Sequence, residues 1–356
     1  MPYPTNNTNL LGNAGNDPLI LVKQYTSVPH LNLSYQTLLP NFCEARNIWF
    51  KELLGNQFVD FIEGNPTDDA IHYVRYALIN YSLYLMSDKQ QIVLADMGVN
   101  ENNDRANTSR PSSDGRRGDA KWSLIQSAYD HIEQLFFDIL LPNISHYTGV
   151  MDGTIYTKYM ALLLNSPRTY QEFGGRLKQR GRLEDWLQLY NTMSTAQNSQ
   201  LLPFLCRLQY DELLKIANNT ITAPSALQKE LLRLCREFVA AITDRDAPGR
   251  NDLKFTAHGT KHRTPQKTNL LNKNPDYRDY EHSYQGAIDR VAEAASAIKV
   301  FLSANATDFP LWEASSCNQA NQSNQLSSIP SICGCQANCC HCHHSSNTTA
   351  GGLVAF

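Results

Sequence analysis

The densest set of potential metal ligands in this 356-residue chain lies near its C-terminus. Five of the nine cysteines fall between Cys333 and Cys342, and three histidines accompany them. Thiolates and imidazoles are ligands that suit Zn²⁺, and Cys339 and Cys342 have the two-residue gap of a zinc knuckle. The candidate zinc ligands are Cys333, Cys335, Cys339 and Cys342.

The surroundings of this cluster favour another interpretation. The ligands are crowded and in excess, no second pair follows at finger spacing, and apolar residues that could pack a small zinc fold are lacking. Ligand identity alone does not fix a coordination geometry. A flexible tail that binds metal only opportunistically therefore remains the alternative to a structural zinc site.

A second candidate is a basic stretch within a long polar segment, predicted as a loop from about residue 244 to 280. Few acids accompany its cations, so it could contact a nucleic-acid backbone or an acidic protein surface. A simple solvated loop is the competing interpretation. The candidate interaction residues are Lys254, Lys261, Arg263, Lys267 and Lys273.

Known catalytic signatures are missing from the sequence. It contains no phosphate-binding glycine loop, no dinucleotide fingerprint, no HExxH pair and no G-x-S-x-G elbow. Asp130, His131 and Glu133 adjoin on a predicted helix, where such residues usually form a solvated face. Although sites assemble in space, this pattern favours a non-enzymatic protein without catalytic or cofactor-binding residues.

Composition indicates a folded protein of two ordinary domains. Apolar residues make up 42% and charged residues 18%, and the net charge of −3 argues against wrapping nucleic acid with the whole surface. The N-terminus lacks a signal-peptide pattern, and no apolar run approaches the roughly 20 residues needed to span a bilayer. We expect cytoplasmic synthesis and no membrane partner, and we expect Cys43, Cys206 and Cys235 to be buried free thiols.

The spacing of apolar residues predicts the helices between which the candidate residues lie. Apolar residues recur at three- and four-residue steps in three predicted helices of the first half, with a polar loop from about residue 88 to 118 before the third. The second half repeats the order helix, helix, long loop, helix at an offset of roughly 150 to 160 residues. The stripes are Leu38, Phe42, Ala45, Trp49 and Leu53; Ile71, Val74, Leu78, Tyr81 and Leu85; Trp122, Ile125, Tyr129, Ile132, Phe136 and Ile139.

We therefore predict a mainly α protein with two tandem helical-bundle domains, long loops and a flexible Cys-rich C-terminal tail. A duplication would explain the repeated layout, and two unrelated bundles would also produce it. The predicted organisation is an extended N-terminal arm (1–20), helical domain 1 (21–143), a connecting segment (144–181), helical domain 2 (182–312), and a Ser/Asn/Gln linker with the Cys/His-rich tail (313–356).

The run Leu38-Leu39-Pro40-Asn41-Phe42-Cys43-Glu44-Ala45, then Trp49 and Leu53-Leu54-Gly55-Asn56-Gln57-Phe58, resembles a known family. Tyr25-Thr26-Ser27-Val28 and Ile92-Val93-Leu94-Ala95-Asp96-Met97-Gly98-Val99 fit its pattern too. This is an uncharacterised family of Bacteroidetes phage and prophage virion structural proteins, similar to the head–tail adaptors of tailed phages. The resemblance covers residues 21 to about 141, and the second half and the cysteine tail depart from it.

The resemblance implies a head–tail adaptor or connector: a homo-oligomeric ring subunit that docks between the portal and the tail. Its expected partners are other copies of itself, the portal protein and tail or further connector proteins, with contact to DNA also allowed. Its expected location is the virion, after assembly in the host cytoplasm. The alternative is a nucleic-acid-binding accessory protein with a zinc-knuckle-like tail.

Overall fold

The computed structural model describes most of the chain between residues 35 and 313. The described residues are Leu10, Val22, Gln24, Tyr25, 35–89, 114–147, 149–250, 253–256, 259–262 and 276–313. Most of the predicted arm (1–20) and the whole predicted tail after residue 313 lie outside them. All statements below concern the described residues.

The protein is mainly α-helical, as the periodicity predicts. The first part of the chain forms α2 (Tyr35–Glu44), the π-helical turn η1 (Ala45–Phe50), α3 (Lys51–Leu54), α4 (Asn56–Gly64), α5 (Ala70–Lys89), α6 (Asp114–Gln134) and the π-helical turn η3 (Leu135–Leu140). The second part forms α7 (Thr154–Ala161), α8 (Pro167–Glu172), α9 (Arg182–Thr195), the π-helical turn η4 (Ala196–Leu201), α10 (Leu202–Ala217), α11 (Ala226–Arg250), α12 (Asp276–Ala304), the 3-10 turn η5 (Ala306–Asp308) and α13 (Pro310–Glu313).

Two predicted loops are shorter than expected. α6 already begins at Asp114, so it includes the last five residues of the loop predicted up to residue 118, and α11 continues to Arg250. Residues predicted as loop then form a two-stranded antiparallel hairpin, β1 (Leu253–Thr256) and β2 (Gly259–His262). The prediction failed here because polar composition identifies exposure rather than the absence of backbone hydrogen bonding.

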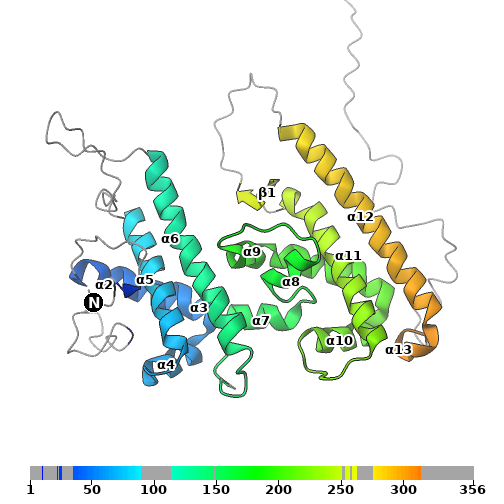
Figure 1. Ribbon diagram of the computed structural model, residues 1–356, viewed down its shortest axis with the longest axis horizontal. Helices are drawn as coiled ribbons and strands as arrows, with labels where there is room; N and C mark the ends of the chain where they lie inside the picture. Colours follow the sequence, from blue (N-terminus) through cyan, green and yellow to red (C-terminus); the bar gives the residue numbers. More distant parts are fainter. Residues whose placement is uncertain are drawn as a thin grey trace, which may run out of the picture.

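Two long helical hairpins dominate the shape. α5 packs along α6, and α11 packs along α12. In Figure 1 both hairpins have the same left-to-right order, and α7, α8 and α9 lie between them. The end of α5, the start of α6, the end of α11 and the start of α12 all point to the upper edge of that view.

Buried positions repeat at a constant spacing in the helical run that precedes each hairpin. The spacing between residues 38 and 189 is also the spacing between the π-helical turns η1 and η4. Buried polar residues of the first run correspond at this spacing to buried polar residues of the second. Buried pairs are Leu38 and Leu189, Asn41 and Thr192, Phe42 and Met193, Ala45 and Ala196, Arg46 and Gln197, Phe50 and Leu201, Leu54 and Leu205, Val59 and Tyr210, and Ile62 and Leu213.

A kink follows each π-helical turn at the same spacing. Gly55 has φ +99° and ψ +158°, and Cys206 has φ +60° and ψ +161°. Gly55 suits such backbone, whereas Cys206 adopts a conformation that is uncommon for a residue with a side chain. The structure thus keeps the same break in the helix where the sequence offers no glycine.

The hairpins also correspond residue by residue. Ser82 in α5 and Thr243 in α11 are both fully buried, and each hydroxyl donates to the carbonyl four residues earlier, that of Leu78 at 2.5 Å and that of Val239 at 2.7 Å. Bonds of this type satisfy a buried hydroxyl within a helix. Helices α5 and α11 are therefore counterparts.

An arginine on each of these helices holds the chain segment that precedes the helical run. Arg75 Nε donates to the carbonyl of Leu10, and Arg236 Nε donates to that of Leu163, both at 2.9 Å. Arg75 lies 5.8 Å from the ring centre of Tyr25, and Arg236 lies 5.7 Å from that of Phe173.

These correspondences define two copies of one structural unit, the duplication that the sequence suggested. We call the described residues from 10 to 147 the first unit and residues 153–313 the second unit. Leu10, predicted to lie in an extended arm, is buried in the core of the first unit. The connecting segment, for which no secondary structure was predicted, contains α7 and α8 and opens the second unit.

Two of the three helical cysteines behave as predicted. Cys43 and Cys235 are buried free thiols, and burial raises the pKa of Cys235. Cys206, at the kink of the second unit, is instead disulfide-bonded. The expectation of a free thiol at this position was wrong.

Candidate functional site

The most elaborate polar cluster lies where the two units meet. Glu133 of α6 has a side chain only 3% exposed, and Arg182 at the start of α9 holds it. Arg182 Nη2 lies 2.6 Å from Glu133 Oε1, and Arg182 Nε lies 2.7 and 2.9 Å from the two carboxylate oxygens. Burial raises the pKa of Glu133, and the charge of Arg182 opposes that shift.

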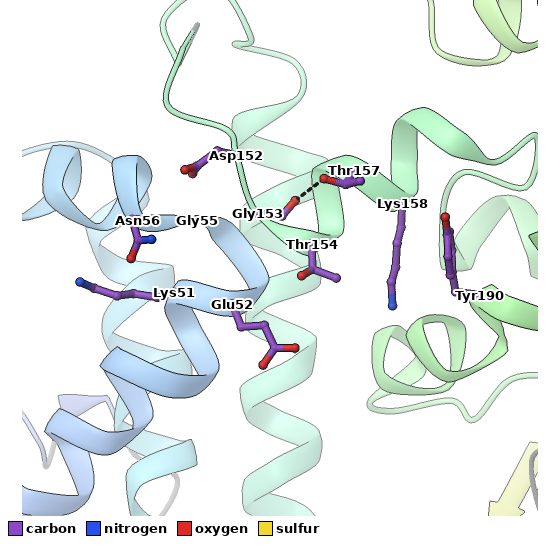
Figure 2. Close-up of a pocket in the computed structure, with 10 residues that line it drawn as sticks. All are labelled: Lys51, Glu52, Gly55, Asn56, Asp152, Gly153, Thr154, Thr157, Lys158 and Tyr190. Atoms are coloured by element: carbon purple, nitrogen blue, oxygen red, sulfur yellow. Dashed lines mark hydrogen bonds between the residues drawn. The ribbon is translucent and has the colours of Figure 1, made fainter.

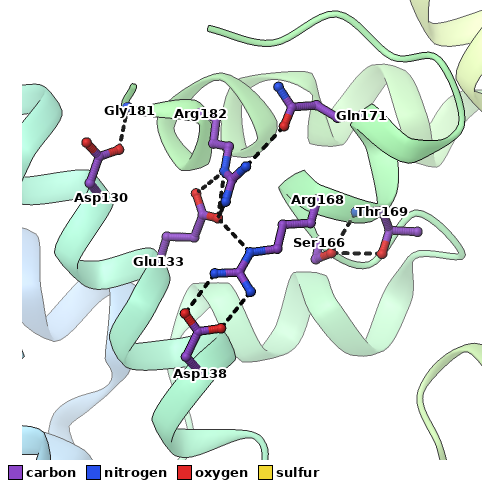
Figure 3. A network of polar contacts seen from close by, with 9 residues as sticks. All are labelled: Asp130, Glu133, Asp138, Ser166, Arg168, Thr169, Gln171, Gly181 and Arg182. Carbon is purple, nitrogen blue, oxygen red and sulfur yellow. Dashed lines mark hydrogen bonds and ion pairs between the residues drawn. The ribbon is translucent and has the colours of Figure 1, made fainter. Parts of the chain in front are cut away.

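A second arginine reaches the same helix from α8. Arg168 donates to both carboxylate oxygens of Asp138 at 2.7 Å, and its Nε lies 3.6 Å from Glu133 Oε1. Figure 3 shows both arginines converging on α6 from the second unit. The Arg168 side chain is 50% exposed, so this pair adds less to stability than the buried one.

Backbone and aromatic contacts complete the junction. Asp130 accepts a hydrogen bond from the Gly181 amide at 2.6 Å, and Arg180 Nε lies 3.5 Å away. About two helical turns beyond Asp130, in η3, Phe137 meets the fully buried Trp186 edge to face, with ring centres 6.4 Å apart. An acidic and aromatic face of α6 and η3 thus binds a basic segment of the second unit.

The same segment is held equally firmly to its own unit. Tyr170 of α8 donates to Asp244 of α11 at 2.5 Å, and Arg290 of α12 lies 3.2 Å from the other Asp244 oxygen. Burial raises the pKa of both Tyr170 and Asp244. A side chain at Gly175 would collide with the Tyr170 ring at 2.5 Å, so the loop passes directly over this ring.

A shallow groove of about 380 Å³ lies near the junction, between α3, α4, α7 and α9. Figure 2 shows that its walls carry both charges, with Lys51 and Glu52 on one side and Lys158 and Tyr190 on the other. Lys158 donates to the carbonyl of Leu187 at 3.3 Å and lies 4.8 Å from the Tyr190 ring centre. Burial lowers the pKa of Lys158.

The floor of this groove is backbone. A Cβ added to Gly153 would lie 2.3 Å from the Leu54 carbonyl carbon, and one added to Gly55 would lie 1.6 Å from an Asp152 oxygen. The two glycines therefore let α4 and α7 start in direct contact. The described hydrogen bonds of the groove fix these helices and assemble no paired nucleophile and base.

The sequence-predicted interaction residues fall only partly within the described chain. Lys254 of β1 and Lys261 of β2 are direct cross-strand neighbours. Arg263, Lys267 and Lys273 lie outside the described residues, as do the candidate zinc ligands Cys333, Cys335, Cys339 and Cys342. Within the part of the chain that is described, no group of three or more His, Cys, Asp or Glu side chains could hold a metal ion.

The junction itself was missed by the sequence analysis. Asp130 and Glu133 were assigned to a solvated face, and that assignment was wrong because the second unit covers both. His131 is part-buried, bonds the carbonyl of Ser127 and stacks on Tyr76. The one available signal was the arginine-rich composition of the connecting segment, which could have been matched with these acids.

Fold and junction together define a helical protein of two repeated units fixed to each other by charged and aromatic contacts. The chain belongs to a family of unknown function, DUF6712, whose model matches residues 31–147 and 201–322. The matched segments fall one in each unit. No curated protein and no solved structure matches the chain. Among the described residues, no helix combines the length and the apolar character needed to cross a bilayer.

Proposed function

We propose that this protein is a structural virion component, a ring-forming head–tail adaptor subunit that docks between the portal and the tail. The observation that carries the proposal is the common edge of the two hairpins in Figure 1. The helix ends at that edge are joined in sequence by residues 90–113 in the first unit and by residues 251–275 in the second. In a ring, these two segments would make the contacts between neighbouring subunits along that edge.

The junction supports the same role. Arg182 and Arg168 of the second unit bind Glu133 and Asp138 of the first. On the other side of α8, Arg290 and Asp244 bind each other within the second unit. Together these ion pairs hold the two units as one block. A subunit that transmits force in an assembly gains from such a fixed connection, because units that move relative to each other would lose entropy on assembly. The expected partners are other copies of the chain, the portal protein and tail or further connector proteins.

The test is co-assembly with a portal protein from a tailed phage or prophage that encodes this chain. Purified protein is mixed with the portal and examined by mass photometry and negative-stain microscopy. The proposal predicts a ring of additional density coaxial with the portal. A protein that stays monomeric and never joins the portal would contradict it.

A nucleic-acid-binding role is favoured by a single observation. Lys254 of β1 and Lys261 of β2 are partners in the register of the β-hairpin, so two basic residues occupy neighbouring positions of this element, and clustered basic residues suit contact with a phosphate backbone. The double variant Lys254→Ala/Lys261→Ala then weakens salt-dependent binding to duplex DNA in a mobility-shift assay. Equal binding by the variant and the wild type, or none by either, would reject this role for the hairpin.

A further inference from the structure

Cys206 lies at the kink of α10, in a backbone conformation that is almost restricted to glycine, with φ +60° and ψ +161°. The equivalent residue of the first unit is Gly55, at φ +99° and ψ +158°. A glycine would therefore form the second kink without strain. A cysteine at this place indicates that its side chain has a role of its own, because strained backbone persists where something else compensates for it.

The disulfide bond of Cys206 narrows that role. The chain has nine cysteines, and Cys43 and Cys235 are free thiols. The partner of Cys206 is therefore one of the six cysteines that follow Glu313 in the sequence, all of them outside the described residues. These six are Cys317, Cys333, Cys335, Cys339, Cys340 and Cys342.

The last described helix ends beside the kink. α13 packs on α10 (Figure 1), and Trp312 Nε1 donates to the carbonyl of Phe204 at 3.0 Å. Trp312 and Phe309 are both buried, so this turn belongs to the core. Phe204 precedes Cys206 by two residues in α10. Cys317 follows Trp312 by five residues, which span up to about 17 Å, so it can reach Cys206 while α13 stays in place.

The first unit shows what a side chain at such a kink would meet. A Cβ on Gly55 would lie 1.6 Å from an Asp152 oxygen and 2.8 Å from the Gly153 amide nitrogen. Asp152 and Gly153 belong to the segment that leaves the last helices of the first unit, α6 and η3. By the structural repeat, we expect the Cys206 side chain to meet the segment that leaves the last helices of the second unit. That segment begins after Glu313.

We propose that Cys206 and Cys317 form a disulfide that fastens the chain leaving α13 across the kink of α10. Cys317 has the shortest path, because it follows the buried Trp312 by five residues, whereas the next candidate, Cys333, follows it by 21. The entropy of loop closure favours the shorter path by about ninefold in effective concentration. This contact lies within one chain and is independent of the adaptor role.

Closure of this bond is an oxidation that needs a small disulfide such as oxidised glutathione. One cysteine thiolate attacks that disulfide and releases one glutathione, and the second thiolate attacks the mixed disulfide and releases the other. The two cysteines lose two electrons and two protons, and these leave with the two molecules of glutathione. A reducing cytoplasm favours the reverse reaction, so the bond closes when the protein enters an oxidising medium.

The test compares two full-length variants that each keep one cysteine after α13. The first variant keeps Cys317, with serine in place of the five later cysteines. The matched control keeps Cys333, with serine in place of Cys317 and the last four. Each protein is equilibrated at graded ratios of reduced to oxidised glutathione, alkylated in urea with N-ethylmaleimide and digested with trypsin. Cys206 then lies in peptide 183–207 and every later cysteine except Cys235 in peptide 300–356, so mass spectrometry resolves the linked pair.

The linked pair should form in the wild type and in the variant that keeps Cys317. In that variant the effective concentration should be about ninefold above that of the control. Equal effective concentrations in the two variants would overturn the proposal, as would a Cys206 that is fully alkylated in the oxidised wild type.

Hydrogen exchange gives a second readout in the wild type. The amides of α13 should exchange more slowly in the linked protein than after reduction with dithiothreitol, because the bond holds the end of this helix on α10. An exchange rate that reduction leaves unchanged would contradict the fastening of α13.

Discussion

Removal of Arg182 gives the sharpest test of the junction between the units. In Arg182→Ala the Glu133 carboxylate stays buried and keeps only Arg168, whose Nε is 3.6 Å away. Removing one partner of a buried ion pair costs about 3 to 5 kcal/mol, since the remaining charge is left without compensation. Because Arg168 retains some attraction, we expect a loss near the lower end, about 3 kcal/mol at pH 7.

The pH dependence of this loss identifies its cause. The pKa of Glu133 is already raised in the folded chain by burial, and loss of Arg182 raises it further. The folded variant then takes up a proton at higher pH than the unfolded chain. The deficit relative to the wild type is therefore complete at neutral pH and shrinks as the pH falls through the Glu133 pKa.

The assay is urea denaturation followed by circular dichroism at pH 7 and pH 5. The matched control is Arg168→Ala, because Arg168 is half exposed and its loss should cost about 1 kcal/mol or less. The double variant Glu133→Met/Arg182→Met should recover most of the stability, since no buried charge remains. An Arg182→Ala deficit that is equal at both pH values, or unchanged in the double variant, would refute the reasoning.

Three further predictions concern single positions. Gly55→Ala should lower the free energy of unfolding by about 1 to 3 kcal/mol, because φ is +99° and the added methyl meets Asp152. The control Gly64→Ala should not destabilise the protein, because the space around Gly64 is open, and thermal melts compare the two variants. Arg236→Ala should speed amide exchange of the segment around Leu163 while the first unit keeps its protection, as measured by hydrogen exchange with mass spectrometry. Cys235 should react with a thiol reagent only after unfolding, because burial raises its pKa and blocks access, and rapid labelling of the native protein at this residue would disprove that.

The sequence predicted the helices best where one apolar stripe was clear. Leu38, Phe42 and Ala45 lie on one buried side of α2 and η1 as their spacing indicates. The connecting segment resisted prediction because its helices α7 and α8 are short and their stability comes from tertiary contacts such as Tyr170 with Asp244.

The residue-level repeat was hidden for a different reason. Matching buried positions hold chemically unlike side chains, such as Arg46 and Gln197, so that geometry is kept while identity is lost. The junction was missed because a glutamate on a helix is usually exposed, and Glu133 is buried only through its contact with Arg182, which lies far along the chain.

Two of the three π-helical turns in the described residues, η1 and η4, carry information about ancestry. η1 and η4 each occupy six residues and precede a kink by the same distance. A π-helical turn arises when an α-helix gains a residue, and two independent gains at matching places would be a coincidence. A single insertion in an ancestral segment that was later copied in tandem explains both turns. In a ring of such chains, every gene product would supply two descendants of that ancestor.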